Sequence, residues 1–427
     1  MRRLGHRPTA LVLSGGGARG AYEAGIIRYL REELPPSVRP SVRFDILCGS
    51  SVGAITACFL AATMDDPPNQ GKVLASLWSD LTLEQVYKVH GQDLWTLVRK
   101  MWRAATNEPL RPEGWRLYDI LHPEPLEEMV RTHAPWPRIS ANLAKGLFLA
   151  LSVSATKISS GSTIVFVQRR EGGVPAWSRD PYNIAREAII GPEHALASAA
   201  IPLLFRSVKI SDEYFCDGSV RQNTPLSPAL RLGAEKVLII SLRYRPKGLP
   251  PGRPLKGYPT TPLLMGKVLN ALMLDHTDYD LDRLRRFNAL LEAGEATFGA
   301  DFIPKMNETV QRMRGQPYRL VQDMVLRPSR DIATIAASHA KKRRIRDASA
   351  VTLPTKLLHR IAQSQLMTEA DLASYLLFDG DYAKDLMTLA MEDAHAQREE
   401  LMAFFADDTS RRPRRGMDDV PPDPKVA

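Results

Sequence analysis

A serine stands at the centre of the pattern Gly49-Ser50-Ser51-Val52-Gly53. The pattern follows a predicted strand over residues 43–48 and opens a predicted helix over residues 54–63. A sharp turn between a strand and a helix lifts a serine hydroxyl above the sheet, and flanking glycines avoid a steric clash there. Ser51 is therefore a candidate nucleophile, although a serine that only caps a helix would give the same local pattern.

A second glycine-rich turn, Gly15-Gly16-Gly17-Ala18-Arg19-Gly20, joins a predicted strand over residues 9–14 to a predicted helix over residues 21–34. A dinucleotide site would need an acidic residue at the end of the next strand, and a phosphate loop would need a Gly-Lys-Ser/Thr ending. Neither is present. Parallel strands end at the same edge of a sheet, so the two turns should face each other, which favours an oxyanion hole built from glycine amides.

A base must activate a serine nucleophile, and Asp217 is the best candidate. It follows a short predicted strand over residues 214–216 and precedes Gly218, and a carboxylate in a partly dry site can accept a proton. Taken alone, Asp-Gly is only a hairpin signal. None of the nine histidines lies in an evident loop at the end of a late strand: His6, His90, His122, His133, His194, His276, His339, His359 and His395.

Together with the segment Ala197-Ser198-Ala199-Ala200-Ile201-Pro202-Leu203-Leu204-Phe205, these motifs resemble the patatin-like phospholipase family in order and spacing over residues 8–243. The resemblance implies an α/β fold with three α/β/α layers and a mostly parallel central sheet. It implies a Ser51–Asp217 dyad that hydrolyses lipid acyl esters with no metal and no cofactor. It also implies an oxyanion hole at Gly15, Gly16 and Gly17 with help from Arg19, supported by Gly20, Gly49, Gly53 and Gly218.

Ser219 departs from the family pattern, which usually has Gly or Ala after Asp-Gly. Its hydroxyl could hydrogen-bond Asp217 and alter the basicity of that carboxylate. The same dyad would also serve an acyltransferase or a thioesterase, and the fold could instead belong to a lipid-binding protein without catalytic activity.

The chain carries 57 basic and 48 acidic residues, a formal net charge of +9 that suits an anionic membrane or nucleic acid equally well. The basic run Lys341-Lys342-Arg343-Arg344 has no interleaved aromatic residues, so no nucleic acid partner is expected. A solvated face is the first interpretation of this run, and peripheral contact with an anionic membrane is the alternative. Asp278, Asp280 and Asp282 have calcium-loop spacing. Arg283 and Ala289 stand where such a loop needs Gly and Glu, so no metal site is expected.

The resemblance implies a patatin-like domain over residues 8–243. Composition and periodicity then predict a linker over 244–262, a helical extension over 263–405 and a disordered tail over 406–427. Predicted helices in the extension cover residues 263–291 and 369–405. Within the first domain, residues 70–145 are predicted to be mostly helical, with helices near residues 74–89, 94–105 and 117–130. Five of the six tryptophans lie there, either as packing residues or as the lining of an acyl groove.

Three cysteines, Cys48, Cys58 and Cys216, argue against a disulfide framework and fit a reducing compartment. No stretch approaches the roughly 20 apolar residues of a spanning helix, and the short apolar run near the start is unlike a signal peptide. The sequence therefore predicts a cytoplasmic protein whose contact with any membrane is peripheral.

Overall fold

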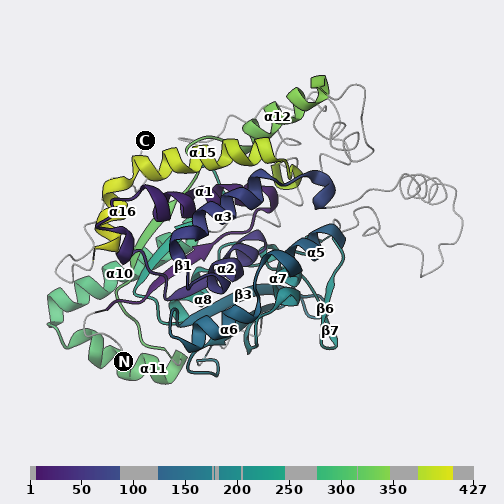
Figure 1. Cartoon of the computed structure of the whole chain (residues 1–427). Coiled ribbons are helices and arrows are strands. Elements are labelled where there is room, and N and C mark those ends of the chain that lie inside the picture. Colours follow the sequence, from purple (N-terminus) through teal and green to yellow (C-terminus); the bar gives the residue numbers. More distant parts are fainter. Residues whose placement is uncertain are drawn as a thin grey trace, which may run out of the picture.

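The computed structural model describes residues 6–86, 124–175, 177, 182–202, 205–245, 277–314, 316–346 and 374–406. Helices cover both faces of a central sheet within these residues (Figure 1). The helix predicted over residues 94–105, most of the predicted linker and nearly all of the predicted tail lie outside the described residues.

The central sheet has the strand order β5-β4-β3-β2-β1-β8-β9, with β7 paired to β3 and β6 paired to β7. Neighbours pair in parallel except β3 with β4, β3 with β7 and β6 with β7, so the predicted, mostly parallel sheet is confirmed. The strands are β1 (Thr9–Leu13), β2 (Ile46–Ser50), β3 (Ala150–Lys157), β4 (Thr163–Arg169), β5 (Asn183–Glu187), β6 (Val208–Ile210), β7 (Glu213–Asp217), β8 (Lys236–Ile240) and β9 (Gln322–Leu326).

Strand β1 lies in the middle of the sheet, and every one of its residues is buried. Successive side chains of a strand point to opposite faces. Leu11 and Leu13 therefore enter one apolar cluster, while Ala10 and Val12 enter another on the opposite face. A strand buried on both sides needs a continuous apolar sequence, which is why this one was recognisable from sequence alone.

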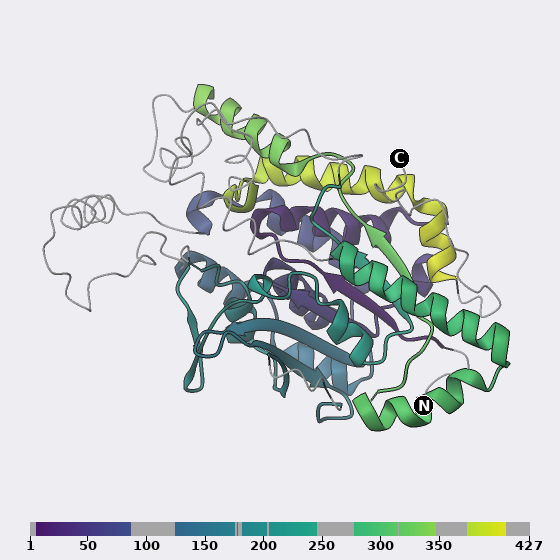
Figure 2. The same cartoon turned by 180° about the vertical axis from the view of Figure 1, so that it is seen from behind.

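The larger cluster packs helices against one face of the sheet, and the smaller cluster packs α8 (Leu226–Arg231) and α10 (Thr277–Phe298) against the other. Figure 2 shows α10 lying across the sheet on this second face. The helices of the first face are α1 (Ala21–Arg28), α2 (Val52–Ala62), α3 (Pro67–Ser79), α5 (Glu124–His133), α6 (Pro137–Ala144), α7 (Pro192–Ser198), α12 (Ile332–Arg346), α15 (Gly380–Ala396) and α16 (Arg398–Phe405).

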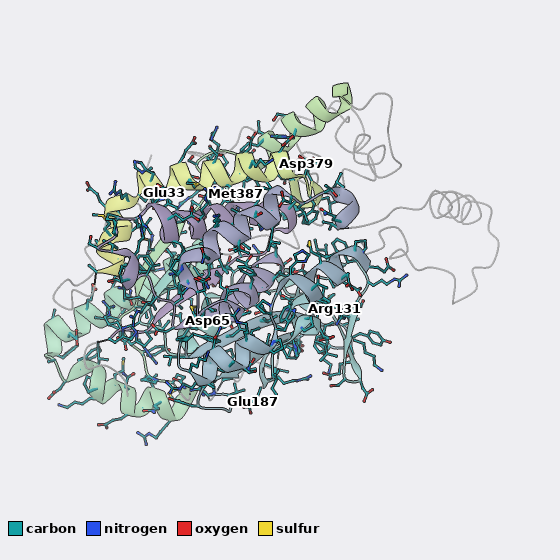
Figure 3. The ribbon with its side chains drawn as sticks, viewed as in Figure 1. Glu33, Asp65, Arg131, Glu187, Asp379 and Met387 are labelled. Atoms are coloured by element: carbon teal, nitrogen blue, oxygen red, sulfur yellow. The ribbon has the colours of Figure 1, made fainter. Side chains whose placement is uncertain are left out.

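The region predicted as a helical extension is helical, but it also contributes β9 to the sheet, parallel to β8. The single helix predicted over residues 369–405 is two helices, α15 and α16, separated at Gln397. Helix α15 lies along α1 (Figures 1 and 3), and Figure 3 labels Met387 on α15 and Asp379 just before its first residue. The hydroxyl of Tyr22 in α1 donates a hydrogen bond of 2.8 Å to Asp393 in α15.

The remaining described part of the C-terminal region includes α11 (Phe302–Arg314). The basic run at residues 341–344 lies in α12. The structure describes the backbone of this run but not its side chains. Its contact with lipid stays a prediction. Within the described ranges no helix is long and apolar enough to cross a membrane, and no cluster of His, Cys, Asp and Glu could hold a metal ion.

One fully buried carboxyl group lies inside the helical layer, that of Glu23 in α1. Neither of its side-chain oxygens makes a hydrogen bond of ordinary geometry among the described residues. Burial raises the pKa of Glu23 well above its usual range, because a charge is costly away from water, and the Thr56 hydroxyl offsets this rise only in part. The folded protein therefore favours the protonated form of this side chain.

Replacing Glu23 with Gln should stabilise the protein increasingly as the pH rises. In the unfolded chain Glu23 ionises above about pH 4.3, whereas the fold keeps it protonated, so rising pH favours unfolding of the native chain. Gln cannot ionise and removes this effect. Urea unfolding of both proteins at pH 5 and pH 8 should show a larger free-energy difference in favour of Glu23→Gln at pH 8. An equal difference at the two pH values would contradict the argument.

Candidate active site

Ser51 occupies the turn between β2 and α2, with φ 53° and ψ −128°. These angles are unusual for a residue with a side chain, and such strain concentrates at functional sites. A side chain on Gly53 would place its Cβ 2.5 Å from the carbonyl oxygen of Leu13, so the helix that follows the turn lies directly against the end of β1. The predicted strand–turn–helix around Ser51 is confirmed.

The Ser51 hydroxyl Oγ donates a hydrogen bond of 2.6 Å to Oδ2 of Asp217. Both side chains are almost fully buried. Asp217 reaches this position because it ends β7, which pairs antiparallel with β3 and places Asp217 opposite Ala155. Residues 166 positions apart in the chain therefore meet at one edge of the sheet.

Asp217 is held at both its backbone and its side chain. The amide of Ser219 donates to Oδ1 at 2.7 Å, and the hydroxyl of Thr156 donates to the Asp217 carbonyl at 2.9 Å. Burial raises the pKa of Asp217 to about 6, because desolvation disfavours the carboxylate more than the hydrogen bonds from Ser51 and Ser219 stabilise it. A carboxylate with this pKa is a better base than one exposed to water.

The hydroxyl of Ser219 lowers the pKa of Asp217, as the sequence suggested, but by less than burial raises it. It lies where a Cβ on Gly15 would come within 1.9 Å of it. The backbone amide of Ser219 also contacts Asp217 and donates to Oδ1. An amide is available whichever residue stands at this position, so the departure from the family pattern leaves that contact in place.

Ser198, at the end of α7, fixes the backbone of Ser51. The Ser51 amide donates to Ser198 Oγ at 2.9 Å, and that hydroxyl donates to the carbonyl of Ser154 in β3 at 2.6 Å. Ser198 belongs to the segment 197–205 that carries part of the family resemblance, but nothing in the local pattern marks it as a neighbour of Ser51. Leu203 and Leu204 of the same motif lie outside the described residues.

The glycine loop faces Ser51, with one correction to the predicted oxyanion hole. The amide of Gly15 already donates to the carbonyl of Asn223 at 3.0 Å, so it is not available to a substrate oxygen. The amides of Gly16 and Gly17 make no such backbone bond in the described part of the chain. Gly17 and Ser51 line the same cavity.

Arg19, which was predicted to help form the oxyanion hole, contacts a distant segment of the chain, and its role in the oxyanion hole stays a prediction. Its side chain is buried, and Nε donates to the hydroxyl of Ser374 at 2.8 Å. The guanidinium carbon lies 3.9 Å from the centre of the Tyr375 ring. The structure thus directs this charge to a segment far along the chain, which no local signal around the glycine loop could reveal.

The four glycines predicted to support the motifs occupy the two turns and the end of β7. Gly20 ends the short helical turn before α1, and Gly49 lies in β2 two positions before the nucleophile candidate. Gly53 is in the first turn of α2, and Gly218 directly follows Asp217.

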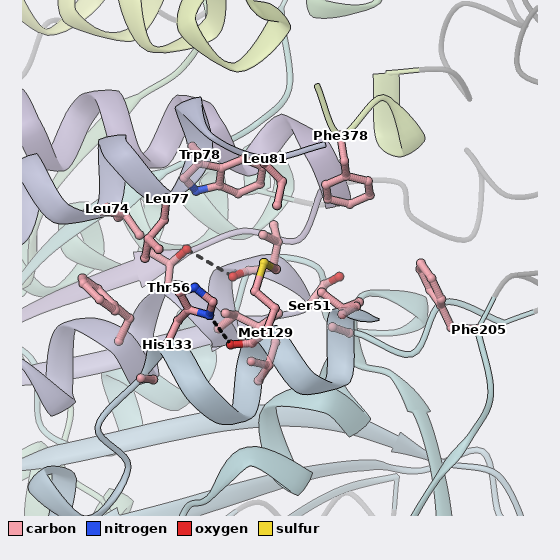
Figure 4. A pocket seen from close by; sticks show the side chains of 18 of the residues that line it. Ser51, Thr56, Leu74, Leu77, Trp78, Leu81, Met129, His133, Phe205 and Phe378 are labelled. Atoms are coloured by element: carbon pink, nitrogen blue, oxygen red, sulfur yellow. Dashed lines mark hydrogen bonds between the residues drawn. The ribbon is translucent and has the colours of Figure 1, made fainter. Parts of the chain in front are cut away.

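A cavity of about 110 Å³ opens beside Ser51 (Figure 4). Trp78 and Trp136, from the tryptophan-rich region, both line it, so these residues pack in the core and also border the cavity. The rest of the wall is mainly apolar and includes Ile55, Phe59, Leu74, Met129, Phe205 and Phe378.

One histidine, His133, also lines the cavity. Its Nδ1 is hydrogen-bonded to the carbonyl of Met129, 3.0 Å away, one turn earlier in α5 (Figure 4). The Ser51 hydroxyl donates its hydrogen bond to the Asp217 carboxylate and not to this histidine.

A family model described as Patatin-like phospholipase matches residues 11–230. The match covers just over half of the chain and includes both glycine turns, Ser51 and Asp217. The chain belongs to the patatin-like phospholipase family.

Known proteins show similarity over shorter stretches. Patatin-like protein 2 of Arabidopsis thaliana is 30% identical over 126 residues, which is 28% of this chain and 30% of that protein. Lysophospholipase nte1 of Aspergillus terreus is 35% identical over 101 residues, which is 22% of this chain and 6% of that protein. The match therefore spans less than a third of the length of either relative.

Among solved structures, VipD from Legionella pneumophila is similar with 14% sequence identity and a TM-score of 0.28, covering 90% of this chain and 67% of that chain. The ExoU–SpcU complex from Pseudomonas aeruginosa gives 18% identity and a TM-score of 0.27, covering 92% of this chain and 76% of that chain. The family assignment rests on the sequence match.

Reaction of Ser51 with a fluorophosphonate should accelerate as the pH rises through about 6. Only the ionised form of Asp217 can accept the serine proton, so the rate should follow the fraction of ionised carboxylate and level off above that pH. Mass spectrometry of the labelled serine over time, between about pH 4.5 and 8, measures this rate. A rate that stays constant over the range would rule out Asp217 as the titrating base.

Proposed function

We propose that this protein is a serine hydrolase that cleaves fatty acyl esters of lipids. The observation that carries the proposal is the hydrogen bond from the Ser51 hydroxyl to the buried Asp217 carboxylate, placed at the wall of an apolar cavity. Membership of the patatin-like phospholipase family supports the same chemistry.

In the first half of the reaction, Asp217 Oδ2 accepts the Ser51 proton while Oγ attacks the acyl carbonyl carbon. The amides of Gly16 and Gly17 stabilise the negative charge that develops on the carbonyl oxygen. Collapse of the tetrahedral intermediate breaks the bond to the alcohol, which leaves with the proton from Asp217. An acyl-serine remains.

In the second half, water takes the place of the alcohol. Asp217 removes a proton from this water as its oxygen attacks the acyl-serine carbonyl, and the same amides stabilise the second intermediate. Breakdown releases the fatty acid and returns the proton to Ser51. The carboxylate acts as base and then as acid in each half, which suits a group whose pKa is raised to about 6.

The cavity argues for an acyl chain rather than a polar substituent next to the reacting carbonyl. Its wall is formed mainly by aliphatic and aromatic side chains, and each buried methylene contributes about 0.8 kcal/mol to binding. Two relatives carry the printed name lysophospholipase or patatin-like protein, which fits a phospholipid or lysophospholipid as substrate. Replacing water by another acyl acceptor would give an acyltransferase, and a thiol in place of the alcohol as leaving group would give a thioesterase.

Ser51→Ala and Asp217→Asn should each lower hydrolysis of a lysophospholipid by at least about a thousandfold. Ser51→Ala removes the attacking oxygen, and Asp217→Asn keeps the shape of the side chain but cannot accept a proton. Release of fatty acid from lysophosphatidylcholine, followed by mass spectrometry, measures the rate. The same assay with added lysolipid or with an acyl thioester separates hydrolysis from acyl transfer and thioester cleavage.

Two exposed residues give matched controls. Ser76→Ala on the surface of α3 and Asp212→Asn in the turn before β7 make the same chemical changes away from the cavity, and both should retain full activity. An Asp217→Asn variant with near-normal rate would exclude the dyad. A folded wild-type protein that neither cleaves lipids nor reacts with fluorophosphonates would favour the non-catalytic alternative.

A further inference from the structure

The glycine loop is in contact with residues 374–378, a segment more than 350 positions away in the sequence. Arg19 donates to Ser374 and lies over the Tyr375 ring. Gly17, with φ +55°, lies so close that a Cβ there would be 2.4 Å from the Tyr375 carbonyl oxygen. The contact is therefore made by the backbone of the loop as well as by its arginine.

Helix α15 holds this segment in place. Asp379 caps the helix by accepting hydrogen bonds from the amides of Asp381 and Tyr382, each at 3.1 Å. The fully buried Tyr382 directs its hydroxyl to the carbonyl of Ser374 at 3.4 Å. Because α15 is itself packed along α1, the segment is joined to the helix that follows the glycine loop.

The end of the segment borders the cavity. The ring of Phe378 stacks on Trp78, with centroids 6.3 Å apart and an angle of 11° between the planes. Both residues line the cavity together with Ser51, and Figure 4 shows Phe378 and Trp78 side by side on one side of it. One short segment thus contacts the glycine loop at its beginning and the cavity at its end.

We propose that residues 374–378 belong to the active site. The first residues of this segment position the glycine loop, and its last residue, Phe378, determines specificity. Arg19 is a positioning residue that acts through Ser374 and Tyr375 to hold the Gly16 and Gly17 amides in place. Phe378 limits the length of acyl chain that the cavity accepts. The inference rests on the proposed acyl hydrolase function.

The positioning role follows from the demands of an oxyanion hole. Its donors act only when they are already aimed at the position of the developing charge, and a displacement of about 1 Å can cost about a hundredfold in rate. A loop of three glycines has little stiffness of its own. A buried guanidinium that donates a charge-assisted hydrogen bond and lies on an aromatic ring supplies the missing restraint.

A double-mutant cycle tests the positioning role. Ser374→Ala removes the acceptor of the Arg19 bond without touching Arg19, and Arg19→Gln removes the charge. If Arg19 acts through the segment, each change should lower kcat about tenfold with KM nearly unchanged, and the double variant should be no slower than the slower single variant. If Arg19 instead stabilised the oxyanion directly, Ser374→Ala would have little effect on kcat. Arg19→Gln would then lower kcat by the same factor in the wild-type protein and in the Ser374→Ala variant.

A chain-length profile tests the specificity role. Phe378→Ala removes the ring that stacks on Trp78 and enlarges the cavity, so kcat/KM for p-nitrophenyl palmitate relative to p-nitrophenyl butyrate should rise at least about fivefold. Phe378→Leu, which keeps an apolar side chain of smaller size, should give a smaller change in the same direction. If the ratio of kcat/KM values is unchanged in both variants, or moves toward butyrate, Phe378 does not limit the length of the acyl chain.

Two further measurements separate this inference from the proposed function. Fluorophosphonate labelling of Ser51 in the wild-type protein, with Ser51→Ala as the blank, tests the nucleophile alone, and its absence would remove the proposed function. The inference alone would be overturned if the wild-type protein is labelled and hydrolyses substrate normally while the Ser374 variant keeps the wild-type kcat and the Phe378 variants keep the wild-type chain-length profile. Leu284→Ala, in the cluster on the opposite face of the sheet, should lower the melting temperature without changing kcat or the chain-length profile.

Discussion

A serine hydroxyl bonded to a buried carboxylate is the interaction on which the rest of the site depends. Burial makes Asp217 more basic by raising its pKa to about 6, but a buried charge without partners would destabilise the fold. The Ser51 hydroxyl and the Ser219 amide supply one donor to each carboxylate oxygen. These two hydrogen bonds stabilise the Asp217 carboxylate at a buried position, away from competing hydrogen bonds with water.

The sheet brings these groups together through strand direction. Strands β1, β2 and β3 run parallel, so the glycine loop, Ser51 and the end of β3 share one edge. Strand β7 runs the opposite way along β3 and delivers Asp217 to that edge. Ser198 then joins the turn to β3 by accepting from Ser51 and donating to Ser154. Ser51 is thus fixed by the same hydrogen-bonded frame that positions Asp217.

The sequence allowed prediction of features that depend on local pattern. The buried strands, the turn at Ser51 and the placement of Asp217 after a strand all follow from short runs of residues. The edge strands β5 and β9 were missed because an edge strand meets only one neighbour and can carry polar residues such as Arg186 or Asp323. The partner of the Gly15 amide and the contact of Arg19 with Ser374 arise from tertiary packing, which no spacing in the chain encodes.

The contact between the glycine loop and residues 374–378 has a consequence for biosynthesis. A ribosome delivers the loop first and the segment that restrains it only after most of the described chain has been made. Until then Trp78 lacks the Phe378 ring against it, and β8 lacks the neighbouring strand β9. A nascent chain therefore carries Ser51 and Asp217 beside a cavity whose wall is completed only when Phe378 has been made.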